Sequence, residues 1–213
     1  MFNITKEWLR SQNIYSVDII KFAEKNQLIG LPAVEFIKRL IEFNELYFAN
    51  RLITKLLDQR ELVRYAVFAA ESVLPIWVKR YPHDDRPRKA IDMANEWLNV
   101  SGEKPDSVKY AAIAVSDTAA EAVEHSNAYV SAARAAQAAE FTADVIVATA
   151  YATDKNDNVH TSYYTYYVAH AAYCAARYDY DDSSVDAGNK MLRDILTFGI
   201  ELIESREPCK EKP

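Results

Sequence analysis

Residues 111–152 read AAIAVSDTAAEAVEHSNAYVSAARAAQAAEFTADVIVATAYA, and 17 of these 42 residues are alanine. Alanine has the highest helix propensity, and its small side chain lets two helix axes approach closely. One helix over the whole segment would be about 65 Å long at ~1.5 Å per residue, which is too long for a compact chain of this size. We therefore expect two helices, with a break at His125-Ser126-Asn127 and a cap from Ser126 or Asn127.

Apolar residues recur at helical spacing along most of the remaining chain. The Thr5 hydroxyl is placed to cap the first helix, and Pro32 suits a first helical turn, where its missing N–H costs nothing. Pro75 falls inside a long helical pattern and should kink the helix there. Further helices are expected over residues 46–57, 61–80, 161–177 and 185–204.

The low glycine content argues against a β-rich fold. The 213 residues include four glycines and seven prolines, whereas sandwiches and barrels need many turns and turns draw on glycine. No segment repeats at a fixed period of about 20–50 residues, which disfavours a strict solenoid. We predict an all-α protein, an irregular bundle of about 8–10 helices with an alanine-rich C-terminal half. Its expected parts are an N-terminal helical segment over residues 1–60, an alanine-rich helical domain over 61–204 and a flexible tail over 205–213.

Charge is distributed unevenly along the chain, whose formal net charge is −6. Residues 1–104 carry 16 Lys/Arg and 14 Asp/Glu, whereas residues 105–213 carry 9 and 17. A broad basic surface for duplex nucleic acid is therefore not expected. The acidic half suits a basic partner protein or keeps the chain soluble.

No targeting or membrane segment is expected from the sequence. The chain has no run of about 18 apolar residues, as a membrane span requires, and the opening MFNITKEWLRSQ lacks the apolar stretch of a signal peptide. Cys174 and Cys209 do not form a disulfide framework, and reduced thiols are the simplest interpretation. We expect a cytoplasmic protein of a bacterial host cell, with no metal ion or cofactor.

Several cations lie in the segment YPHDDRPRKA, residues 81–90. Arg86, Arg88 and Lys89 beside a helix start suit a phosphate or a carboxylate. In the alternative interpretation Asp84 or Asp85 caps the helix, and the cations pair with these aspartates or with the acidic C-terminal half. The sequence favours this structural interpretation and keeps anion binding as a hypothesis.

The helix expected over residues 161–177 carries tyrosines, a histidine and an arginine at i, i+3, i+4 and i+7 spacing, which places them along one face. Such a face is able to stack a base or a planar ligand and to hold its phosphate. In the alternative, the rings pack against alanines of facing helices and leave their hydroxyls at the surface. The candidate residues of this region are His160, Tyr163, Tyr166, Tyr167, His170, Tyr173 and Arg177.

Catalytic motifs are sparse. His170 and Cys174 lie four residues apart on the same expected helix, the minimum for a thiol nucleophile, but no orienting acid or oxyanion hole accompanies them. Gly-x-Ser-x-Gly, His-Glu-x-x-His and Walker patterns are absent. An acidic stretch lacks the Glu-x-x-His spacing of carboxylate metal sites and is interpreted as a solvated helix face. Its residues are Asp117, Glu121, Glu124 and His125. We predict that the chain is not an enzyme.

Several segments resemble one family of proteins. The principal ones are VRYAVFAAESVLP at 63–75, DRPRKAI at 85–91 and WL at 97–98, followed by long alanine-rich helices. In this order they resemble the helical immunity-protein family of polymorphic toxin systems and its alanine-rich bacterial and tailed-phage relatives. The segments ITKEWL at 4–9, FANRLI at 48–53 and DILTFGI at 194–200 are similar to the phage-borne relatives. Many relatives have tryptophan-rich alanine repeats where this chain has tyrosines.

The resemblance implies a stoichiometric binding protein rather than a catalyst. We therefore expect a non-enzymatic protein that neutralises a toxin or a phage-defence effector by binding it, as an immunity or anti-defence inhibitor. The alternative is a sponge that sequesters a small nucleotide signal in a pocket lined by tyrosine, arginine and histidine, provided that the tyrosine face and the Arg86/Arg88 cations converge. A homo-oligomer is also possible from the sequence.

Overall fold

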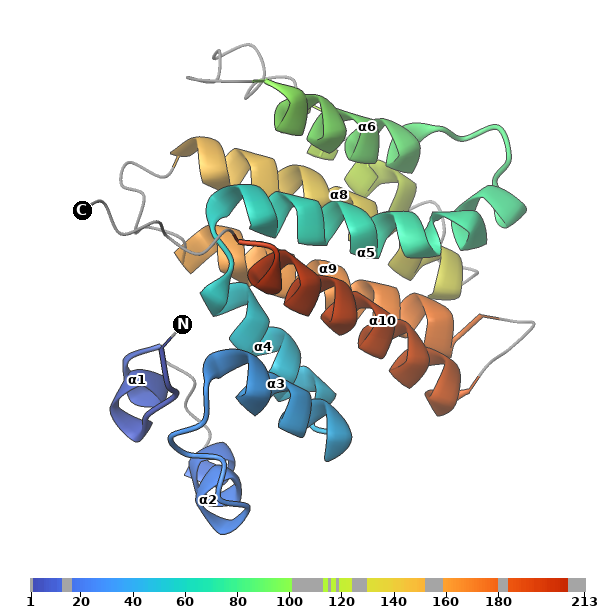
Figure 1. Cartoon of the computed structure of the whole chain (residues 1–213). Helices are drawn as coiled ribbons and strands as arrows, with labels where there is room; N and C mark the ends of the chain where they lie inside the picture. The colour runs from blue at the N-terminus through green and yellow to red at the C-terminus, as the bar shows by residue number, and fades with distance from the viewer. Residues whose placement is uncertain are drawn as a thin grey trace.

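The computed structural model describes residues 2–12, 17–100, 113–114, 116–117, 119–123, 130–151, 159–179 and 184–206. These residues are helical almost throughout (Figure 1). The helices are α1 (Lys6–Ser11), α2 (Val17–Lys25), α3 (Ala33–Glu42), α4 (Leu46–Leu56), α5 (Gln59–Arg80), α6 (Arg86–Asn99), α8 (Val130–Tyr151), α9 (Val159–Arg177) and α10 (Val185–Glu204). The described residues between 113 and 123 are helical as well. Within the described residues, β pairing is limited to one bridge between Asn3 and Pro32. The predicted all-α class is confirmed.

Local signals place several helix ends as expected. The Thr5 hydroxyl accepts a hydrogen bond from the backbone N–H of Trp8 at 3.1 Å and so caps α1. Pro32 occupies the N-cap position of α3, one residue before the first turn in which it was expected. Pro75 lies inside α5, which runs from Gln59 to Arg80, and the kink expected there stays a prediction.

The start of α5 lies two residues before the position predicted from apolar spacing. A reciprocal capping box explains the difference. The Asp58 carboxylate accepts from the backbone N–H of Glu61 at 2.8 Å, and the Glu61 carboxylate accepts from the backbone N–H of Asp58 at 2.8 Å. Because both donors are satisfied before the apolar stripe begins, the helix extends beyond that stripe.

Among the helices with described bounds, the four longest form the body of the molecule, with α5 at its centre (Figure 1). α5 packs against α8, α9, α10 and α6, and α8 packs along α9. Small side chains of α8 are buried at these contacts, including Ala135, Ala136 and Ala139, while large rings such as Tyr65 and Trp77 of α5 lie in the same core. This packing of rings among small residues agrees with the alanine-rich sequence.

A glycine allows α10 to lie close to α4 and α5. A Cβ atom at Gly199 would lie 2.6 Å from Cε2 of Tyr65 and 2.9 Å from Cγ2 of Ile53. Both of these side chains are fully buried, so neither has space to move away. α4 packs against both α10 and α9, and it forms one wall of the site described below.

The segment before α1 pairs with the turn before α3 through backbone hydrogen bonds. The N–H of Ile4 donates to the carbonyl of Leu31 at 2.9 Å, and the N–H of Gly30 donates to the carbonyl of Ile4 at 2.8 Å. Gly30 has a φ of +93°, a conformation that favours glycine. These bonds hold the start of α1 beside the turn that precedes α3.

Some predictions fall on residues outside the described part of the chain. They concern the break at 125–127, its caps Ser126 and Asn127, and Cys209 in the tail. The division of the chain at residue 60 stays a prediction. Among the helices that the structure describes, none combines the length and the apolar character needed to cross a membrane.

Candidate functional site

A buried polar network fixes α9 against α4 and α5. The amide nitrogen of Asn50, a fully buried residue of α4, donates to the backbone carbonyl of Tyr166 at 3.2 Å. The amide oxygen of Asn50 accepts from the hydroxyl of Tyr65 at 2.9 Å. Because three helices share this network, the position of Tyr166 relative to α4 is set by interior hydrogen bonds rather than by surface contacts.

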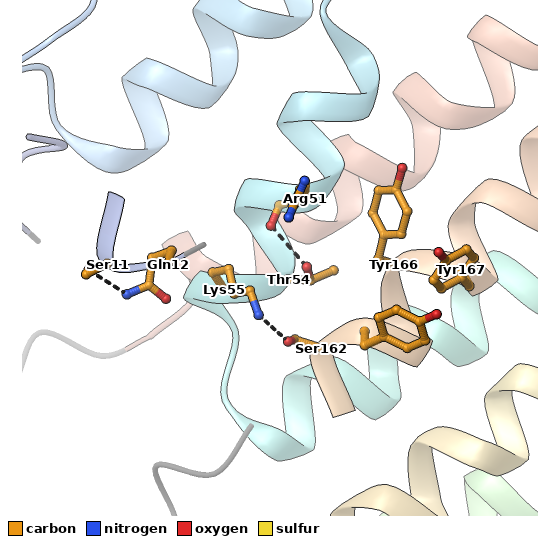
Figure 2. A pocket seen from close by; sticks show the side chains of 9 residues that line it. Ser11, Gln12, Arg51, Thr54, Lys55, Ser162, Tyr166 and Tyr167 are labelled. Carbon is orange, nitrogen blue, oxygen red and sulfur yellow. Dashed lines mark hydrogen bonds between the residues drawn. The ribbon is translucent and has the colours of Figure 1, made fainter. Parts of the chain in front are cut away.

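A pocket of about 440 Å³ opens beside this network, between α4, α9 and the end of α1 (Figure 2). Its volume lies in the range of small-molecule sites. None of its described lining residues is acidic, although the chain as a whole carries a net charge of −6. The lining residues are Ser11, Gln12, Arg51, Thr54, Lys55, Ser162, Tyr163, Tyr166 and Tyr167.

Lys55 is the half-buried cation of this pocket. Its Nζ donates to Oγ of Ser162 at 2.7 Å, as Figure 2 shows. Burial lowers the pKa of Lys55 below its ordinary value, and the nearby charge of Arg51 lowers it further. Among the residues that the structure describes, no carboxylate forms an ion pair with Lys55.

Three tyrosines of α9 form the aromatic side of the pocket. The ring centroid of Tyr163 lies 4.6 Å from that of Tyr167, and the centroids of Tyr166 and Tyr167 are 5.3 Å apart. Tyr163 is 55% exposed, whereas Tyr166 is half-buried, and burial raises the pKa of Tyr166. The structure therefore brings together three of the tyrosines predicted from spacing.

The other predicted residues of α9 lie outside the lining of this pocket. Tyr47 of α4 packs its ring 5.7 Å from the centroid of His170 and 5.4 Å from that of Tyr173. Nη1 of Arg177 contacts the hydroxyl of Tyr173 at 3.3 Å. His160 is exposed at the start of α9. The predicted face is thus divided into a pocket wall near one end and an aromatic cluster near the other.

The pair of His170 and Cys174 does not have the features of an activated nucleophile. Nε2 of His170 lies 4.0 Å from Sγ of Cys174. Burial raises the pKa of the Cys174 thiol and lowers the pKa of His170, and both shifts disfavour a thiolate–imidazolium pair. Within the described residues there is also no group of three or more His, Cys, Asp or Glu side chains placed to hold a metal ion.

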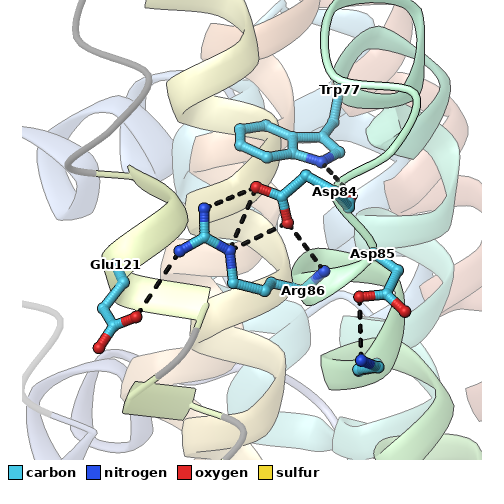
Figure 3. Close-up of polar contacts among 6 residues, drawn as sticks. Trp77, Asp84, Asp85, Arg86 and Glu121 are labelled. Atoms are coloured by element: carbon cyan, nitrogen blue, oxygen red, sulfur yellow. Dashed lines mark hydrogen bonds and ion pairs between the residues drawn. The ribbon is translucent and has the colours of Figure 1, made fainter.

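In the Arg-Pro segment at the start of α6, Arg86 and Lys89 are paired with acids (Figure 3). Nε of Arg86 donates to Oδ1 of Asp84 at 2.9 Å, and Nη2 donates to Oδ2 at 2.6 Å. Nη1 lies 3.6 Å from Oε2 of Glu121. The backbone carbonyl of Asp84 accepts from Nε1 of Trp77 at 2.8 Å. Arg86 is therefore part of a structural cluster that joins α5, α6 and the helical residues near 121.

The remaining residues of this segment are at the surface. Lys89 forms an ion pair with Asp85 at 3.0 Å, and Arg88 is exposed. Asp85 occupies the N-cap position of α6 without a side-chain cap, while Oδ1 of Asp84 accepts from the backbone N–H of Arg86 at 3.1 Å. α6 packs on α5 and α8, whereas the pocket lies between α4 and α9. The described pocket therefore does not combine the Arg86/Arg88 cations with the tyrosines, as the nucleotide hypothesis required.

The acidic stretch has two parts. Asp117 and Glu121 are exposed, in agreement with a solvated face, while Glu124 and His125 lie outside the described residues.

A second acidic pair, Glu140 and Asp144 of α8, was not identified from the sequence. Burial raises the pKa of Glu140 to about 7, with a further contribution from the charge of Asp144. Oδ1 of Asp144 accepts from Oγ of Ser116 at 2.7 Å.

Sequence reasoning missed the cations of the pocket. Arg51 and Lys55 are four residues apart on α4, a spacing that places both on one face of the helix. This spacing is the signal by which the sequence could have identified the two cations as neighbours. Their relation to the tyrosines depends on how α4 packs on α9, which the sequence pattern does not contain. The other missed lining residues are Ser11, Gln12, Thr54 and Ser162.

The comparison with protein families agrees with the fold and with the segments that resemble immunity proteins. The family described as "Imm-5 like putative immunity protein" matches residues 52–164, which is more than half of the chain. The chain therefore belongs to this immunity-protein family. The matched region contains the Arg-Pro segment, and it includes Lys55, Ser162 and Tyr163 of the pocket. No curated protein and no solved structure matches the chain.

Proposed function

We propose that this chain neutralises a protein effector, a toxin or a phage-defence enzyme, by stoichiometric and non-catalytic binding. The single observation that supports this most strongly is the family match over residues 52–164. An immunity protein protects a cell by holding its effector in an inactive complex, which requires a rigid surface and no reaction chemistry. The packed core of rings and alanines holds the helices rigidly, so the surface that these helices present is rigid as well.

The outer side of α4 and α9 is the proposed contact surface. Tyr47, Tyr163 and Tyr178 are 41%, 55% and 46% exposed there, and the guanidinium carbon of Arg177 lies 5.3 Å from the ring centroid of Tyr178. Tyrosine and arginine are enriched among residues that dominate binding energy at protein interfaces. Rings already packed on one another lose little side-chain freedom on binding, which favours a tight complex.

The net charge of the C-terminal half, rather than the charge of the contact surface itself, supports a basic effector. Residues 105–213 carry 9 Lys/Arg and 17 Asp/Glu, and an acidic partner accelerates the encounter with a basic one in a salt-dependent manner. The association rate should therefore fall as ionic strength rises. An association rate that does not change with salt would remove this part of the proposal.

One feature favours the alternative, capture of a small nucleotide signal. The pocket between α4 and α9 places two cations next to three tyrosines. This arrangement differs from the one expected from the sequence, because Arg51 and Lys55 take the place of Arg86 and Arg88. Effector binding and nucleotide capture are separable, since they involve different molecules and different assays.

A protection experiment tests the proposed function. The chain is co-expressed with toxin effectors encoded beside immunity genes of this family, and the purified pair is weighed in solution. We expect growth to be restored and a complex of fixed stoichiometry. Tyr163→Ser should weaken the complex at least tenfold, whereas Val78→Ser should not, because Val78 is similarly exposed but lies on α5. Full inactivation of the effector at a small fraction of one equivalent would indicate catalysis and overturn the proposal.

A further inference from the structure

We propose that the pocket between α4 and α9 is a binding site for a nucleotide, with Lys55 and Arg51 holding the phosphate and the tyrosines holding the base. Nucleotide binding and effector binding are tested by different variants, because Lys55 belongs to the pocket alone, whereas Tyr163 belongs both to the pocket wall and to the proposed contact surface. The proposal rests on the charge of the pocket, its aromatic wall and its framework.

The pocket contains the half-buried charge of Lys55, which has no acidic partner among the described residues. Lys55 is half-buried and its single hydrogen bond goes to the neutral hydroxyl of Ser162 at 2.7 Å. Arg51 adds a second positive charge one turn earlier on α4, and no described lining residue is acidic. A half-buried cation without an acidic partner is unfavourable, and an anion that enters the pocket relieves this cost. Phosphate is well matched, since it accepts several charge-assisted hydrogen bonds at once.

The aromatic wall favours a planar group on that phosphate. The ring of Tyr167 lies between two others on the α9 side of the pocket, with its centroid 4.6 Å from that of Tyr163 and 5.3 Å from that of Tyr166. Every base has a π-face, so stacking on such rings binds a nucleotide without demanding a particular base. Inorganic phosphate would use the cations alone, and a nucleoside would use the rings alone.

The framework of the site is built before any ligand arrives. The Asn50 network ties the backbone of Tyr166 to α4 and α5. The Thr54 hydroxyl donates to the carbonyl of Arg51 at 3.1 Å, and the Gln12 amide donates to the hydroxyl of Ser11 at 3.3 Å. Gln12 faces the pocket from the end of α1, opposite the tyrosines, as Figure 2 shows. Its amide is placed to meet polar atoms of a ligand, and a pre-formed site loses little entropy on binding.

Calorimetric titration of the full chain with AMP, GMP, CMP and UMP tests the proposal. We expect at least one of them to bind, and we expect adenosine and inorganic phosphate to bind at least about tenfold more weakly, because each engages half of the site. Lys55→Met should reduce the affinity about tenfold or more through the loss of a charge-assisted contact. Lys190→Met, which removes an exposed charge from α10, should leave the affinity unchanged.

The test separates the possible failures. A pocket that binds none of the four nucleotides at millimolar concentration would overturn the inference, as would a Lys55→Met chain that binds as tightly as the Lys190→Met chain. Thermal unfolding of each variant shows whether it is folded, and Lys55→Met is expected to melt at or above the temperature of the unmodified chain. If the chain neutralises an effector but binds no nucleotide, the proposed function stands and this inference alone fails.

Discussion

Two cationic regions of the molecule differ in how their charges are balanced. In the Arg-Pro segment, Arg86 is held by Asp84 and Glu121, and Lys89 is held by Asp85. In the pocket between α4 and α9, Lys55 has a serine as its partner and Arg51 as its neighbour. Arg86 and Lys89 pair with acids that are close to them in the sequence, whereas Lys55 of α4 has a hydroxyl of α9 as its partner. The second arrangement is the one suited to an external anion.

The largest expected effect comes from breaking the framework of the pocket. Asn50→Ala leaves the buried Tyr65 hydroxyl and the Tyr166 carbonyl without their partner. We expect the free energy of unfolding to fall by about 2–4 kcal/mol, measured by urea denaturation. A change below about 0.5 kcal/mol would mean that the network does not position α9.

A smaller effect is expected in the Arg-Pro segment. Asp84→Ala removes the bidentate partner of a half-buried arginine, and we expect a loss of about 1–2 kcal/mol of stability. Asp85→Ala is the matched control, since its partner Lys89 is exposed and such pairs contribute about 0–1 kcal/mol. Equal effects of the two substitutions in thermal unfolding would contradict the structural role assigned to Arg86.

The half-buried acid Glu140 of α8 provides a pH-dependent contrast. The pKa of Glu140 is about 7 in the folded chain, above its ordinary value of 4.5, so the folded state binds this proton more tightly than the unfolded state. The resulting stabilisation is complete below the ordinary pKa and is lost as the pH rises through about 7.

Glu140→Gln should remove this pH-dependent loss. We expect the variant to be more stable than the unmodified chain by about 1 kcal/mol at pH 8, a value reduced for partial solvent exposure, with little difference at pH 4. Urea denaturation at both pH values measures the effect. A difference that is equal at the two pH values would show that the titration of Glu140 is not its cause.

The smallest expected effect is the change in the free energy of unfolding when Lys55 of the pocket is replaced. Burial lowers the pKa of Lys55, so the charged form is disfavoured in the folded state at neutral pH. Lys55→Met keeps most of the side-chain volume and removes the charge, and we expect it to raise the free energy of unfolding by a few tenths of a kcal/mol, up to about 0.5. Urea denaturation checks the sign. A clear loss of stability would show that the bond to Ser162 outweighs the cost of the buried charge.

The sequence was sufficient for the helices because helices are set by local patterns. The last helix matches the predicted residues 185–204, where the Ser184 hydroxyl accepts from the N–H of Ala187 at 2.9 Å. The tyrosine helix extends to Arg177, as its spacing predicted. The start of α5 was predicted two residues too late. The apolar stripe begins near residue 61, but the capping box of Asp58 starts the helix at Gln59.

The sequence predicted only the tyrosines of the pocket. The other lining residues were missed because the pocket is assembled from three distant segments. The tyrosines of α9 were visible from their spacing on one helix. Gln12, Lys55 and Ser162 were not visible, since their proximity depends on the packing of α1 and α4 against α9. The cations predicted from the sequence, Arg86, Arg88 and Lys89, form a cluster beside a helix start, and the structure pairs Arg86 and Lys89 with neighbouring acids.

The difference between the two cationic regions is tested most directly by titrating AMP into three chains under one buffer condition. They are the unmodified chain, Lys55→Met and Lys89→Met. We predict equal affinity for the unmodified chain and Lys89→Met, and a loss of about tenfold or more for Lys55→Met. Binding that is lost in Lys89→Met and kept in Lys55→Met would place the anion at the Arg-Pro segment and contradict this account.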